Sequence, residues 1–146
     1  MMSCEDVLVL DATAVNTIVY QFTDSSVPPK YHRSYNIEVT TNSIHFKVDS
    51  YGDLLAEESI ELAPNVFNDL IQIINAAQLV SSKTKAQPGC TGGKTERLMI
   101  TSSNELVYAG EFDHCGGLEI PEKAGDVEKV VQTIKGLIPN FYDYLK

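Results

Sequence analysis

Hydrophobic and polar residues alternate with a period of two over much of the first sixty positions. Such alternation places every second side chain on the same face of a strand. It predicts strands over residues 18–22, 35–39 and 44–48, and a looser run over 54–62 predicts another. The short apolar run 7–10 is expected to form the hairpin partner of the strand at 18–22. Together these segments predict an antiparallel meander in the N-terminal half.

The spacing of apolar residues changes to a helical period at Pro64, and proline is favoured at the first position of a helix. The stripe that follows predicts an amphipathic helix ending near Leu79, formed by Val66, Phe67, Leu70, Ile71, Ile74 and Ala77. A second helix is expected after the N-cap candidate Asp126, with an inward stripe of Val127, Val130, Val131, Ile134 and Leu137. Pro139 interrupts it, so residues 141–145 are expected to form a short final helical turn.

The segment between the two helices is expected to hold a second, shorter pair of strands. Residues 81–96 show no period and are rich in glycine, lysine and small polar residues, which predicts a long glycine-containing loop. Strand patterns over 97–101 and 106–109 flank turn residues at Ser103 and Asn104. These patterns predict a hairpin.

The order of these elements predicts an α+β fold. We expect an antiparallel sheet, built from the N-terminal meander plus the later hairpin, with two amphipathic helices packed on one face as a two-layer sandwich. A chain of 146 residues suits a single globular domain over 1–146.

The chain is acidic, with 20 Asp and Glu against 11 Lys and Arg and a formal net charge of −9. This balance disfavours general nucleic-acid binding, which needs a basic surface. It favours a basic protein partner, because opposite charges accelerate association. Four acids in or beside the run 54–62 predict an exposed edge strand, because charge discourages unwanted strand pairing; they are Asp53, Glu57, Glu58 and Glu61.

Targeting and membrane segments are not evident in the sequence. No stretch reaches the roughly 18 apolar residues of a membrane span, and the run 7–10 is too short for the core of a signal peptide. We therefore expect a cytoplasmic protein that does not engage membranes. In that compartment Cys4, Cys90 and Cys115 are reduced by default.

Two cysteines are expected to meet at the open end of the second hairpin. With the turn centred between residues 103 and 104, facing positions have numbers that sum to 207, which places Cys90 opposite Gly117 and Cys115 opposite Gly92. The segment 81–97 has four basic residues against one acid, so the glycine amides and a lysine here suit an anion. This candidate functional corner consists of Cys90, Thr91, Gly92, Gly93, Lys94, His114, Cys115, Gly116 and Gly117.

Four interpretations of this corner stay open. Cys90 and Cys115 can form a disulfide, which would stabilise the fold by about 2–4 kcal/mol. They can bind zinc with His114 and either His32 or His45, although adjacent His114 and Cys115 lack the usual ligand spacing. One can be a reactive thiolate favoured by nearby positive charge, or both can be buried and inert. No metal site, cofactor or catalytic residue is assigned.

The leading hypothesis for function is a small acidic, non-enzymatic binding or inhibitory module that acts on a protein partner. Its basis is the negative charge, the small size and the absence of a complete catalytic motif from the sequence. An immunity or antitoxin protein that covers a toxin's basic site is one example. The alternative is a thiol- or metal-dependent small enzyme or redox sensor that uses Cys90 and Cys115.

Overall fold

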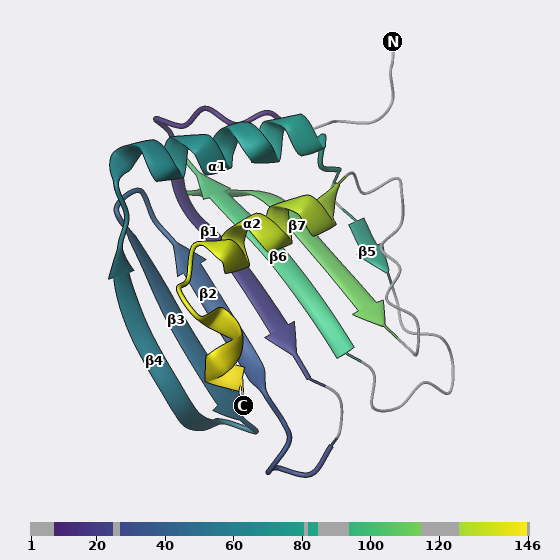
Figure 1. Ribbon diagram of the computed structural model, residues 1–146. Helices are drawn as coiled ribbons and strands as arrows, with labels where there is room; N and C mark the ends of the chain where they lie inside the picture. The colour runs from purple at the N-terminus through teal and green to yellow at the C-terminus, as the bar shows by residue number, and fades with distance from the viewer. Residues whose placement is uncertain (1–7, 25–26, 81, 85–93, 115–125, 146) are drawn as a thin grey trace.

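The computed structural model describes most of the chain, namely residues 8–24, 27–80, 82–84, 94–114 and 126–145. It shows an open, twisted sheet with helices set against it (Figure 1). Within these residues, no helix combines the length and the apolar character needed to cross a membrane.

The first half of the sheet is the predicted meander. It consists of β1 (Val15–Thr23), β2 (Ser34–Val39), β3 (Ser43–Ser50) and β4 (Asp53–Glu61), each antiparallel to the next. The apolar residues of the alternating pattern lie on the buried side of the first three strands, as the sequence predicts. In β4 the pattern is weaker, and almost every residue is exposed.

The second half of the sheet contains the predicted hairpin, formed by β6 (Lys94–Ser102) and β7 (Glu105–His114). A short strand, β5 (Ser82–Thr84), lies parallel to β7. The order across the sheet is β4-β3-β2-β1-β6-β7-β5, so β1 joins the meander to the hairpin. The six longer strands are antiparallel throughout, and the sheet is open, with β4 and β5 at its edges.

The expected hairpin between residues 7–10 and β1 is wrong. Both sides of β1 are occupied, by β2 and by β6, and residues 8–10 form no strand. The side chain of Asn75 instead binds both backbone groups of Leu10, accepting from its N–H at 2.7 Å and donating to its carbonyl at 3.0 Å. A four-residue apolar run has no partner preference of its own, so the packing of the rest of the fold decides where it lies.

The expected loop 81–96 is too long at both ends. It contains β5, and β6 begins at Lys94 rather than at residue 97. Thr95 and Glu96 are polar, so the sequence pattern did not indicate that the strand begins before them. They belong to a central strand because β1 pairs with one side of β6 and β7 with the other.

The helices among the described residues are α1 (Pro64–Ala77), α2 (Val127–Gly136) and the 3-10 helix η2 (Phe141–Leu145). Pro64 opens α1 as predicted, and the side chain of Asp126 caps α2 by accepting from the N–H of Lys129 at 3.2 Å. α2 lies over the strands, whereas α1 runs across them near one end (Figure 1).

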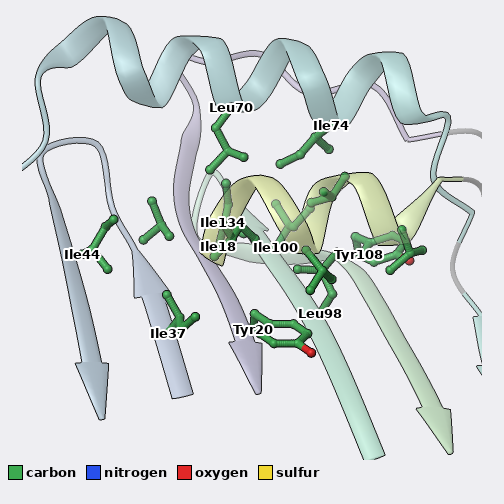
Figure 2. Packing of buried hydrophobic residues seen from close by; sticks show 14 of the residues in the cluster. Ile18, Tyr20, Ile37, Ile44, Leu70, Ile74, Leu98, Ile100, Tyr108 and Ile134 are labelled. Atoms are coloured by element: carbon green, nitrogen blue, oxygen red, sulfur yellow. The ribbon is translucent and has the colours of Figure 1, made fainter. Parts of the chain in front are cut away.

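Side chains from both helices and from one side of the strands form a single buried cluster. Ile18 lies between Val39 and Ile100 across the sheet, and Leu70 and Ile74 of α1 point toward these strands (Figure 2). Fully burying a side chain of this size contributes about 1.5–3 kcal/mol. This core holds the strand ends in place, and those ends carry the polar groups described next.

Candidate functional site

The end of the β6–β7 hairpin places Lys94 directly opposite His114. The predicted sum of 207 holds next to the turn, where Ser102 faces Glu105. A bulge between Ile100 and Thr101 then shifts the register by one residue. The other members of the predicted corner lie outside the described residues; they are Cys90, Thr91, Gly92, Gly93, Cys115, Gly116 and Gly117. The disulfide, zinc and thiolate interpretations therefore stay predictions.

His45 lies too far from this corner to complete a zinc site there. It belongs to β3, which is separated from β7 by three strands. Four strand spacings of about 4.8 Å place His45 roughly 19 Å from His114 across the sheet, whereas zinc ligands lie about 2 Å from the ion. Within the described part of the chain, no three His, Cys, Asp or Glu side chains are placed to hold a metal ion.

A polar cluster that the sequence did not predict lies on the core side of the sheet, near Lys94. Glu96 faces Phe22 and Phe112 in the register, which puts its carboxylate on the core side. The Tyr20 hydroxyl donates to this carboxylate at 2.5 Å. Burial raises the pKa of Tyr20 well above its ordinary value, and nearby Tyr35 and Glu96 add to the shift. The Tyr20 hydroxyl therefore keeps its proton, and donates to Glu96, at pH values where an exposed tyrosine loses its own.

Lys135, in the last turn of α2, covers this polar cluster. Its Nζ lies 5.7 Å from the ring centroids of both Tyr20 and Tyr35 and 5.8 Å from that of Phe141. Burial lowers the pKa of Lys135, and the charges of Glu96 and Glu128 oppose that shift. Three aromatic faces around one ammonium group stabilise the cation and fix α2 over the sheet. We therefore interpret this cluster as stabilising the packing of α2 on the sheet.

The outer edge of the sheet is an acidic strand with exposed leucines. In β4, Leu54 and Leu55 are 56% and 48% exposed. The same nine residues carry four carboxylates and no basic side chain; the acids are Asp53, Glu57, Glu58 and Glu61. β4 pairs with β3 on one side, and no described strand pairs with its other side. Apolar and acidic groups thus share an exposed strand edge.

A Ser–His–Glu arrangement lies on the exposed side of the β3–β4 pair. His45 contacts Ser59 Oγ through Nδ1 at 2.9 Å and Glu57 Oε2 through Nε2 at 2.7 Å. Lys47 lies 3.8 Å from the same carboxylate oxygen. The His45 and Glu57 side chains are 37% and 40% exposed, so water competes for these groups. The arrangement ties Glu57 to β3 beside Lys47, and the other carboxylates of β4 are those of Asp53, Glu58 and Glu61.

A hollow of about 490 Å³ opens at the far ends of β1, β2 and β3. Its walls combine amide, hydroxyl, carboxylate and aromatic groups, from Gln21, Phe22, Thr23, Asp24, His32, Ser34, Tyr35, Asn36, Asp49 and Tyr51. We refer to it below as the hollow. The sequence did not reveal it, because its residues come from three strand ends and two connections.

Hydrogen bonds hold the walls of the hollow in place. Asp24 accepts from the N–H of Arg33 at 2.9 Å, and its own N–H donates to Ser34 Oγ at 2.9 Å. His32 is only 4% exposed; its ring stacks on Tyr51 at 3.8 Å, and its Nδ1 accepts from the Tyr51 N–H at 3.4 Å. The walls are thus preorganised.

Comparisons with known proteins do not assign the chain to a family. No protein-family model matches it, and no curated protein matches it. A solved structure of sheep galectin-11 in complex with glycerol aligns with 82% of this chain and 71% of that one, at 8% sequence identity and a TM-score of 0.25. So distant a likeness carries no argument about fold or ligand.

Proposed function

We propose that this protein is a small acidic binding module, without catalytic activity of its own, that docks on a basic surface of a protein partner and can inhibit it. The observation that carries the proposal is the composition of β4. This edge strand exposes Leu54 and Leu55 beside four carboxylates. Carboxylates give attraction to a basic partner, and the leucines give contact area once the partner has arrived.

The mode of docking that fits this edge is strand addition. An edge strand leaves backbone N–H and C=O groups available along one side, and an extended segment of a partner can pair with them. A second copy of the chain is disfavoured as the added strand, because its own four carboxylates would face those of the first. A segment with alternating basic and apolar residues is complementary.

In this proposal, the rest of the fold holds β4 in position. The helices and the sheet would form two layers, with the core between them and β4 at the border. The acidic net charge of −9 would speed encounter with a basic surface, and this effect weakens with salt. Such a module would act in the cytoplasm and would not bind nucleic acid in general.

A labelled nonapeptide of alternating lysine and valine tests the proposal by fluorescence anisotropy. We expect it to bind at low ionic strength, and amide NMR shifts should concentrate in β4. The double variant Glu58→Lys, Glu61→Lys should weaken binding by about tenfold or more, because each exposed ion pair is worth up to about 1 kcal/mol and two charges are reversed.

Two controls separate strand addition from general attraction. The matched variant Glu105→Lys, Glu128→Lys changes the net charge equally but away from β4, and should weaken binding far less. A peptide of the same charge with a central proline should bind poorly, because proline removes a donor from the added strand. Equal losses in both double variants, or equal binding of the proline peptide, would contradict the proposal.

The register at the hairpin end favours one second candidate. Lys94 faces His114 there, and His114 directly precedes Cys115 in the sequence. The alternative function is thus a thiol- or metal-dependent small enzyme or redox sensor at Cys90 and Cys115. Intact mass with and without reductant, together with metal analysis of the purified protein, tests it. Slow alkylation of both reduced thiols and no bound metal would argue against it.

A further inference from the structure

We propose that the hollow is a binding site for a guanidinium group, and that it receives an arginine side chain of the partner that docks on β4. The inference rests on the proposed function for the identity of the partner, but the hollow itself can be tested alone. Among the described residues, none of those that line the hollow is a lysine or an arginine. Two carboxylates, those of Asp24 and Asp49, belong to the lining, and Asp24 already accepts from the backbone N–H of Arg33.

The chemistry of the lining matches a planar group with several N–H donors. A guanidinium has five N–H donors in a rigid fork and no acceptor. The hollow offers two carboxylates and the side-chain oxygens of Gln21, Asn36 and Ser34 as acceptors. Asp49 already accepts from the N–H of Gly52 at 2.9 Å, but a carboxylate has about four acceptor positions.

The aromatic wall supplies a surface on which a planar cation can stack. Tyr51 packs one side of its ring on His32 at 3.8 Å and remains 54% exposed. Its hydroxyl donates to the carbonyl of Val27 at 2.6 Å, which fixes the ring. Guanidinium groups stack on tyrosine faces, and a fixed ring loses little entropy on binding.

The position of the hollow links it to the proposed docking edge. Tyr51 lines the hollow, and Gly52 alone separates it from Asp53, the first residue of β4. A strand added along β4 would therefore pass close to the hollow at one of its ends. The partner we infer is an extended basic segment that carries an arginine near that end.

Titration of the ¹⁵N-labelled protein with N-acetyl-arginine amide tests the site without a partner. We expect saturating amide shifts at Asn36, Asp49 and Tyr51, in the millimolar range typical of one small fragment. N-acetyl-citrulline amide has nearly the same shape without the charge and should cause far smaller shifts. N-acetyl-lysine amide should bind severalfold more weakly, because it lacks the planar fork.

One pair of variants makes the test specific. Asp49→Asn keeps an oxygen to accept from Gly52 but removes the charge, and should weaken arginine-amide binding by about fivefold to tenfold. Asp69→Asn removes the same charge from an exposed position of α1, outside both the hollow and β4, and should leave it unchanged. The amide spectra report whether each variant is folded. Equal binding of citrulline and arginine amides, or wild-type affinity in Asp49→Asn, would overturn the site.

The outcomes separate this inference from the proposed function. If the lysine–valine peptide binds β4 but arginine amide shifts no residue of the hollow, docking at the edge stands and the guanidinium site is wrong. If arginine amide fills the hollow and the peptide does not bind, the site stands and docking by strand addition is wrong. Shifts spread evenly over all acidic residues would contradict both.

Discussion

The hydroxyl of Tyr20 donates a 2.5 Å hydrogen bond to the carboxylate of Glu96, and so holds an acidic side chain on the core side of the sheet. Tyr20 is 1% exposed, and Lys135 of α2 lies over its ring. The hydrogen bond joins β1 to β6, and the Lys135 contact brings α2 to the same place. A buried polar group is costly unless it is hydrogen-bonded, so this tyrosine matters through its oxygen as well as its ring.

Tyr20→Phe is expected to lower the free energy of unfolding by about 2 kcal/mol, because it removes a buried hydroxyl that donates to a charged carboxylate. Urea denaturation followed by circular dichroism measures the change. Tyr108→Phe is the matched control. Tyr108 is also buried, but its hydroxyl finds no partner among the described residues, so its removal should leave stability unchanged or raise it by about 1 kcal/mol. Equal destabilisation by both substitutions would contradict the role of the Tyr20–Glu96 bond.

The free energy of unfolding is expected to fall as the pH rises from about 10 to about 12. Burial raises the pKa of Tyr108 to about 12 and also raises the pKa values of Tyr20 and Tyr35. Unfolded tyrosines lose their protons near pH 10, so in this window the unfolded state binds fewer protons than the folded state. Urea unfolding at a series of pH values measures the fall. In Tyr108→Phe the fall should be shallower, and an unchanged profile would contradict the assignment.

Below about pH 10, Lys135 should have the opposite effect and raise the free energy of unfolding as the pH rises. Its pKa is lowered by burial, so the folded state releases the proton before the unfolded state does. Stability from this group is therefore gained as the pH rises toward the ordinary lysine value and is lost as the pH falls. Lys135→Met should remove that gain and keep the fall caused by the tyrosines.

Much of the fold follows from the sequence because the strands of the meander and both helices have clear periods. The cap Asp126 and the turn at Ser103 and Asn104 are local signals, and each is confirmed. The prediction that residues 7–10 pair with β1 was wrong because a local pattern does not specify which strand edges stay unpaired. The predicted start of β6 was wrong because the polar residues at the start of this central strand have the composition of a loop.

The candidate site follows from the sequence only in part. The acidic run predicted an exposed edge strand, and β4 is one. The contact of His45 with Ser59 depends on the register between two strands, which no short pattern specifies. The hollow depends on three strand ends that meet only in the folded protein. The position of Glu96 on the core side was not predicted, because a charged residue usually indicates an exposed position.

Gly110 of β7 is expected to resist substitution because of its neighbours. An added Cβ would lie 2.7 Å from the Tyr108 hydroxyl oxygen and 3.1 and 3.2 Å from two ring carbons of Phe112. Gly110→Ala should therefore lower the free energy of unfolding by about 1–3 kcal/mol. In the Tyr108→Phe background the nearest atom is gone, so the same substitution should cost at least about 0.5 kcal/mol less. Gly136→Ala, where an added Cβ meets nothing within 4 Å, serves as the control and should not destabilise. Strict additivity of Gly110→Ala and Tyr108→Phe in urea denaturation would show that the hydroxyl does not set this limit.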